Sequence, residues 1–267
     1  MHDMISQLDA ACDAACEAGR ILLSFLGKVT VREKGRSDLV TDADLAAQQT
    51  IQRILNGRFP EYAFLGEESS QDEQANARQS GKPIWIVDPL DGTTNFVHKM
   101  PGFCVSIALV IDDVVQLGVV HDPVQNATYS SARNGPTLRD GKPIEVSGCD
   151  ALERALVCCS LSPGIRRNDP SVGQFLNVLE ASRSVRRLGS AALNLCYVAE
   201  GCLDSYWTSS VKCWDVAAGY LIALQAGAVV SRIDGSRFNL WEPELLCSSS
   251  LQLQQQMRDC MKIAESH

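Results

Sequence analysis

Hydrophobic and polar residues alternate along this chain with two periods, one typical of helices and the other typical of strands. Residues 4–26 carry apolar side chains at helical spacing, and Gly27 ends the run. The same period predicts further helices over residues 43–57, 172–179, 190–200, 215–226 and 250–264. Residues 70–82 are polar and have no period, so we predict a loop there.

Short apolar runs rich in β-branched residues predict the strands. Residues 103–111 and 114–121 are joined by Asp112-Asp113, which indicates a β-hairpin. Further strands are expected over residues 29–34, 127–132, 155–161 and 228–233, and another apolar run begins at Ile84. Because helices and strands alternate in blocks with hairpins, we expect an α/β chain of layered α and β elements rather than a simple Rossmann order.

Charge and cysteine usage narrow the class of protein. The formal charge of −8 and an isoelectric point near 5.0 argue against nucleic-acid binding, which needs a basic face. The eleven cysteines form no C-x-x-C pair, and none lies at zinc-site spacing from the four histidines, so we expect reduced thiols in a cytoplasmic protein. Without a secretion signal or a stretch of about 18 apolar residues, no membrane association is expected.

The segment 84–96 carries the strongest chemical signal. An apolar run of strand type delivers Asp88, a proline turn follows, and Asp91 comes next. Two carboxylates three residues apart on a sharp turn can bind hard cations, and the Gly92-Thr93-Thr94 helix start offers backbone N–H groups to an anion. Taken alone, the segment is more simply a buried strand, an Asp-Gly turn and a helix cap.

Two further acidic clusters change that interpretation. They are Gly66-Glu67-Glu68-Ser69 upstream and Trp214-Asp215-Val216-Ala217-Ala218-Gly219 downstream. In this order, the three clusters closely resemble those of the inositol monophosphatase family of magnesium-dependent, lithium-sensitive phosphatases. Other segments that resemble the family are Lys34, residues 38–41, Asp44, residues 95–98 and residues 187–192.

The resemblance covers about residues 5–250 and carries expectations about the whole chain. It implies an αβαβα five-layered sandwich that acts as a homodimer. It also implies a single domain over residues 1–267, with a metal-binding half that ends near residue 146 and a C-terminal α/β half over residues 147–267.

Four carboxylates form the expected metal site. If they converged without a cation, they would repel one another and lose hydration, and Mg²⁺ prefers oxygen ligands of this kind. The resemblance implies two or three Mg²⁺ ions: one on Glu67, Asp88 and the Leu90 carbonyl, a second on Asp88, Asp91 and Asp215, and a weaker third near Glu67. The simpler alternatives are a solvated loop charge for Glu67 and a helix N-cap for Asp215.

Further residues are expected to act on the phosphate and on the attacking water. Backbone N–H groups of Gly92, Thr93 and Thr94 would bind the phosphate, and the Thr93 hydroxyl together with Asp44 would orient and deprotonate a metal-activated water. Lys34 resembles the family lysine that faces the metals. The alternatives are a first-turn helix acid for Asp44 and a surface lysine for Lys34.

Substrate contacts are expected from the Ala191 backbone, from Asp215, and from Thr208, which occupies the position of a family glutamate. Because a hydroxyl is a weaker acceptor than a carboxylate, Thr208 predicts reduced selectivity for inositol phosphates. Inositol 1-phosphate is the default among small phosphorylated substrates; the rivals are histidinol phosphate, fructose 1,6-bisphosphate and a 3′-phosphonucleotide. A non-catalytic or moonlighting binding protein is the alternative from another class.

Overall fold

The computed structural model describes residues 4–28, 31–35, 38–162 and 164–262, with the backbone alone given for residues 31–35 and 38–41. Its helices are α1 (Met4–Phe25), α2 (Asp42–Arg58), α3 (Gln71–Gln79), α4 (Thr93–Val97), α5 (Pro170–Ala181), α6 (Ala191–Ala199), α7 (Cys213–Gln225), α8 (Leu251–Met261) and the short 3₁₀ turn Leu152–Arg154. The six long helices that the sequence predicts are therefore confirmed, with boundaries shifted by a few residues.

Two sheets and a hairpin contain the strands. The large sheet runs in chain order through β3 (Ala63–Gly66), β4 (Ile84–Asp91), β5 (Cys104–Ile111), β6 (Val114–Asp122), β7 (Ala127–Ala132), β8 (Thr137–Arg139) and β9 (Lys142–Pro143). The smaller sheet has the order β11 (Ser184–Arg186), β10 (Leu156–Ser160), β12 (Ser205–Thr208), β14 (Leu245–Ser248), β13 (Val229–Ser231). The hairpin pairs β1 (Val31–Gly35) with β2 (Asp38–Thr41).

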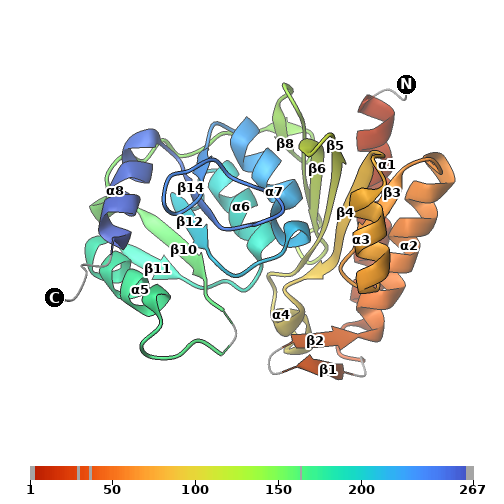
Figure 1. Ribbon diagram of the computed structural model, residues 1–267, viewed down its shortest axis with the longest axis horizontal. Coiled ribbons are helices and arrows are strands. Elements are labelled where there is room, and N and C mark those ends of the chain that lie inside the picture. The colour runs from red at the N-terminus through yellow and green to blue at the C-terminus, as the bar shows by residue number, and fades with distance from the viewer. Residues whose placement is uncertain (1–3, 29–30, 36–37, 163, 263–267) are drawn as a thin grey trace.

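These elements stack as five layers in the order α, β, α, β, α (Figure 1). Alternate residues of the central strands explain the stacking: Trp85 and Val87 pack with α1 and α2, whereas Ile86 packs with α6 and α7 on the other face. The smaller sheet covers the far side of α6 and α7, and α5 and α8 cover its outer face through a third core. The expected αβαβα sandwich is confirmed.

Helix α7 lies close against the large sheet at one strand glycine. A Cβ atom added to Gly118 of β6 would come within 2.6 Å of the Ala218 carbonyl oxygen of α7. A glycine in the middle of a strand therefore allows helix backbone to approach strand backbone directly. This contact fixes α7, and with it Asp215, against the sheet that carries Asp88 and Asp91.

The local predictions have mixed outcomes. The hairpin at Asp112-Asp113 is confirmed, and both residues have positive φ, 50° and 59°, as the turns favoured by two-residue hairpins require.

The predicted loop over residues 70–82 is wrong, because α3 begins there with a capping box. The Ser70 hydroxyl accepts from the Glu73 N–H at 3.3 Å, and the Glu73 carboxylate accepts from the Ser70 N–H at 2.8 Å.

Three other expectations bear on the whole chain. Of the strand expected over residues 29–34, residues 29 and 30 lie outside the described residues, and the rest belongs to β1. All eleven cysteines are free thiols, and five of them are buried. No helix in the described ranges is both long enough and apolar enough to cross a membrane.

Candidate active site

Strand β4 ends in a turn that presents Asp88 and Asp91. Its pairing with β5 shifts in register between these two residues, and the Leu90 N–H donates to the Asp88 carboxylate at 2.9 Å. Gly92 follows with φ of 95°, and a Cβ there would lie 2.8 Å from the Gly102 carbonyl oxygen. Because both the conformation and the space require glycine, the chain can turn directly from the acidic strand end into α4.

The start of α4 lies beside this turn. The first hydrogen bond of the helix joins the Phe96 N–H to the Gly92 carbonyl at 3.1 Å, so the N–H groups of Thr93 and Thr94 precede the helical ladder. The Thr93 hydroxyl donates to the Leu90 carbonyl at 3.1 Å. The Thr93 oxygen therefore keeps its lone pairs for a hydrogen bond from a water or a substrate.

Asp91 joins the large sheet to the central helical layer. One of its oxygens accepts from the Ser190 hydroxyl at 2.6 Å and from the Ala192 N–H at 2.7 Å. Both donors lie at the beginning of α6, where Ser190 is also the N-cap residue. Asp91 therefore binds a helix N-terminus with one oxygen, and its second oxygen is left for another ligand.

The Glu67 turn lies between two glutamines. The Gln48 carbonyl oxygen, from α2, accepts from the Glu68 N–H at 2.9 Å. From α3, the Gln74 amide donates to the carbonyl oxygens of Gly66 at 3.0 Å and of Glu67 and Ser69 at 3.2 Å. Gln74 was not predicted from the sequence, because residues 70–82 were expected to form a loop.

Asp215 is the third residue of α7, so the alternative that it serves as the N-cap is wrong. Lys212 occupies the N-cap position, and its backbone N–H donates to the Asp215 carboxylate at 2.7 Å. This bond resembles the N3 half of a capping box and uses one carboxylate oxygen.

The four carboxylates act on one another electrostatically. Burial raises the pKa of Glu67 to about 8, with a further contribution from the Asp215 charge. Burial also raises the pKa of Asp215 to about 7, aided by the Asp91 charge, and the pKa of Asp91 to about 6 against the hydrogen bonds from Ser190 and Ala192. The pKa of Asp88 is raised by burial and further by the charges of Glu67, Asp91 and Asp215. As they stand, however, no three His, Cys, Asp or Glu side chains of the described chain are close enough to share one ion.

Of the two other expected catalytic residues, the structure describes the side chain of Asp44 but not that of Lys34. Asp44 is buried, 1% exposed, in the first turn of α2, and its charge contributes to the raised pKa of Glu67. It therefore lies on the acidic side of the site. Lys34 belongs to β1, but its side chain lies outside the described residues, so its role stays a prediction.

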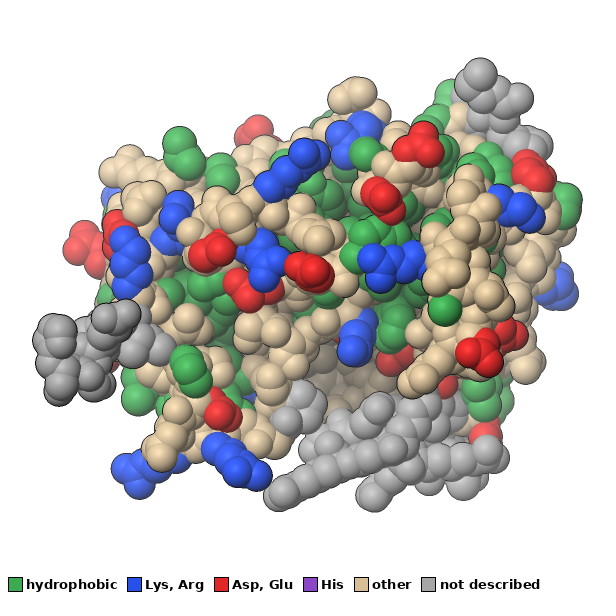
Figure 2. All heavy atoms as spheres, in the orientation of Figure 1, with side chains coloured by type: hydrophobic (Ala, Val, Ile, Leu, Met, Phe, Trp, Pro, Cys, Tyr) green, Lys and Arg blue, Asp and Glu red, His purple; other side chains and the backbone are tan. Residues whose placement is uncertain are grey.

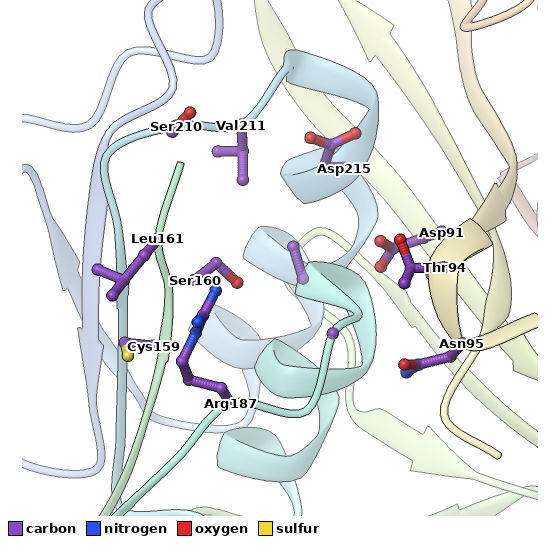
Figure 3. Close-up of a pocket in the computed structure, with 12 residues that line it drawn as sticks. Asp91, Thr94, Asn95, Cys159, Ser160, Leu161, Arg187, Ser210, Val211 and Asp215 are labelled. Carbon is purple, nitrogen blue, oxygen red and sulfur yellow. The ribbon is translucent and has the colours of Figure 1, made fainter. Parts of the chain in front are cut away.

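A pocket of about 430 Å³ opens beside these residues (Figure 3). On one side the close-up shows Asp91, Thr94 and Asn95, with Asp215 at the end of the pocket near Val211. Cys159, Ser160, Leu161 and Arg187 lie on the opposite side. Ala191 also lines the pocket, and the contact of its backbone with a substrate stays a prediction.

Thr208 is not where a substrate contact would be. It is fully buried in β12, and the lining of the pocket includes Ser210 and Val211 instead. The physical reason is that the strand continues through Thr208, which pairs with Ser160 and Leu245, so the chain reaches the pocket only two residues later. The structure therefore does not support Thr208 as the residue that meets the substrate.

Asn95 is a further site residue whose task the sequence did not reveal. Its amide donates to the Gly102 carbonyl at 2.8 Å and to the Leu188 carbonyl at 2.7 Å, which ties α4 to the loop before α6. Arg187, Ser160 and Asn95 come from segments that are far apart in the chain, so only the folded structure brings them to one pocket.

The five-layered fold is that of the phosphatase class that the sequence resembles, and comparisons with known proteins agree. The model of the inositol monophosphatase family matches residues 4–266. The inositol-1-monophosphatase of Synechocystis sp. is 38% identical over 251 residues, which are 92% of this chain and 86% of that protein. Inositol monophosphatase 2 of Solanum lycopersicum is 40% identical over 239 residues, 87% of this chain and 89% of that protein.

A solved structure is similar over nearly its whole length. The extragenic suppressor protein suhB from Bartonella henselae superposes with a TM-score of 0.90 at 29% identity, covering 97% of this chain and 99% of that one. The chain therefore belongs to the inositol monophosphatase family, a family of phosphoric monoester hydrolases.

Proposed function

We propose that this protein is a Mg²⁺-dependent phosphomonoesterase that hydrolyses small phosphate monoesters, with inositol 1-phosphate as the default substrate. The observation that carries the proposal is the gathering of four acidic side chains from three separate segments beside one pocket. Burial raises the pKa of each of them, and repulsion between the carboxylates raises it further for Glu67, Asp88 and Asp215. Among the side chains that the structure describes, which exclude that of Lys34, no Lys, Arg or His forms an ion pair with any of the four.

The chemistry of the donor set suits Mg²⁺, and the family resemblance implies two or three ions. Only oxygen ligands are offered, as hard cations prefer, and a bound cation would offset the repulsion that the carboxylates exert on one another. The residues that would hold the metal are Glu67, Asp88, Leu90 through its carbonyl, Asp91 and Asp215. Asp91 and Asp215 each have one oxygen engaged by a backbone N–H, which orients the other.

When bound, the metal supplies the positive charge that acidifies a water molecule and stabilises the oxygen leaving the phosphorus. The chain supplies the rest. The N–H groups of Gly92, Thr93 and Thr94 bind the phosphate oxygens. The Thr93 hydroxyl donates to the Leu90 carbonyl, so its oxygen would accept a hydrogen bond from the attacking water, and the Asp44 carboxylate would take the one proton that this water releases.

The direct test is phosphate release from a panel of monoesters, with and without metal. EDTA is expected to abolish turnover of inositol 1-phosphate, and excess Mg²⁺ should restore it. The panel adds histidinol phosphate, fructose 1,6-bisphosphate and a 3′-phosphonucleotide. Full activity in metal-free buffer would contradict the metal mechanism, and hydrolysis of none of these esters would contradict the proposed activity.

A further inference from the structure

Arg187 is a cation placed in the wall of the candidate active site. It directly follows β11 and lines the catalytic pocket together with Cys159, Ser160 and Leu161. Figure 3 shows its side chain running along this wall toward Ser160, across the pocket from Asp91 and Thr94. The pocket therefore has an acidic side, where the phosphate chemistry is proposed, and a side that carries one positive charge.

Within the described residues, no carboxylate forms an ion pair with Arg187. Its charge is nevertheless directed into the pocket wall, because it lowers the pKa of the Cys159 thiol against a larger rise caused by burial. A guanidinium without a carboxylate partner presents donors in a planar fork that suits a carboxylate or a phosphate.

The neighbouring Arg186 is different and supplies a natural control. Its guanidinium donates to the Ser184 hydroxyl and, at 3.2 Å, to the Val185 carbonyl. Arg186 does not line the catalytic pocket. Both arginines are exposed and carry the same charge, so a comparison of the two separates contact inside the pocket from the general electrostatic field of the protein.

The dimensions of the pocket give Arg187 a part of the substrate to recognise. A cavity of about 430 Å³ holds more than the phosphate group, so the rest of the substrate extends from the acidic side toward Ser160 and Arg187. Whatever the substrate carries at that end meets a guanidinium.

We propose that Arg187 is a specificity-determining residue that favours phosphate monoesters with a second anionic group, a carboxylate or a phosphate, at the end remote from the hydrolysed phosphate. The same charge disfavours substrates with a cationic group there, such as histidinol phosphate. This inference rests on the proposed phosphomonoesterase activity and specifies its substrate class.

The test uses three esters of similar size that differ in one terminal group. They are 3-phosphoglycerate (anionic), glycerol 3-phosphate (neutral) and phosphoethanolamine (cationic). kcat/KM is measured with saturating Mg²⁺ for the wild type, Arg187→Gln, Arg187→Lys and Arg186→Gln, after thermal melting has shown that each variant is folded.

Arg187→Gln is expected to lower kcat/KM for 3-phosphoglycerate about tenfold, the effect of losing one charge-assisted contact in a partly exposed site. Glycerol 3-phosphate should change by less than about twofold, and phosphoethanolamine should improve. Arg187→Lys should retain part of the preference for the anion, and Arg186→Gln should resemble the wild type.

Two outcomes would overturn the inference: an equal loss on all three esters, or an equal loss in Arg186→Gln and Arg187→Gln. Failure of the wild type to hydrolyse any ester would instead contradict the proposed function. In that case, calorimetric binding of 3-phosphoglycerate and glycerol 3-phosphate to the wild type and Arg187→Gln, which needs no turnover, decides the inference about Arg187. It fails if the variant binds both compounds as the wild type does.

Discussion

The hydrogen bonds from Ser190 and Ala192 both go to the same oxygen of Asp91. A substitution at this residue can therefore affect the two oxygens separately. One oxygen accepts from Ser190 and Ala192 at the start of α6, whereas the other is available for a metal. Asparagine can keep the acceptor on one atom but replaces the second oxygen with an amide that donates and cannot bind a cation. The loss should therefore fall on catalysis rather than on folding.

Asp91→Asn is expected to lower turnover on the order of a hundredfold or more, the scale associated with loss of a major electrostatic stabiliser. Stability should change by about 1 kcal/mol or less, because relief of a buried charge offsets the weakened hydrogen bonds. Initial rates and thermal melting measure the two effects. Ser190→Ala is the control, since it weakens the cap of α6 and leaves the carboxylate in place. Near wild-type turnover in Asp91→Asn would refute the metal assignment.

Thr208 is fully buried in β12 and is not among the residues that line the pocket. A glutamate at this buried position would place an unpaired charge between strands, at a cost of about 3 kcal/mol or more. Thr208→Glu should therefore destabilise the protein instead of recruiting inositol 1-phosphate. The isosteric Thr208→Val should change kcat/KM for that substrate by less than about twofold. A tenfold change with Thr208→Val would show that the hydroxyl contacts the substrate after all.

At the scale of elements, α3 shows what the hydrophobic pattern can miss. The helix is almost entirely polar and buries only Ala77, so it has no apolar face from which a helical period could be detected. The sequence nevertheless contains a signal for the start of this helix, because Ser70 and Glu73 have the spacing of a capping box. Strands β12 and β14 were missed for another reason: each has only four residues, too few to show a period.

The function of α3 is to hold the turn that carries Glu67, and Gln74 makes the contact. Gln74→Ala removes all three hydrogen bonds to that turn, so the Mg²⁺ concentration for half-maximal activity should rise about tenfold. Gln79→Ala, at the exposed end of the same helix, is the matched control. An unchanged Mg²⁺ requirement in Gln74→Ala would mean that Gln48 alone suffices to position the turn.

At the scale of the molecule, the fold was predictable because helical and strand blocks alternate and because three acidic motifs resemble one family. The four candidate carboxylates could be picked out for the same reason, because each lies inside a short motif; their role as metal ligands stays a prediction. The opposite wall of the pocket was not predictable, because Ser160 ends β10 and Arg187 follows β11 in the smaller sheet, and both face Asp91 only after both sheets have packed on α6 and α7.

The family resemblance also predicts a homodimer, and one surface deserves a test as its interface. Met100 and Leu188 are exposed and border a hollow of about 350 Å³ beside the catalytic pocket. On the face in Figure 2, by contrast, acidic and basic side chains are interspersed among polar ones.

Sedimentation equilibrium should give a mass twice the 29.0 kDa of the chain. Met100→Lys should shift the protein toward the monomer, because it places a charge on an apolar contact. Lys142→Met, a substitution at the exposed strand β9, is a control that should not. A monomer at all concentrations would contradict the homodimer, and an unaffected Met100→Lys dimer would place the interface elsewhere.

The bond from the Ala192 N–H to Asp91 has a kinetic consequence. First-turn amides of a helix have no acceptor within it and usually exchange their hydrogens quickly with solvent. Here the amide of Ala192 is protected by a carboxylate from another layer of the sandwich, at 2.7 Å. Its exchange rate therefore reports on the junction between the large sheet and α6. An opening that separates these layers would appear at this single amide before it appeared in the interior of either layer.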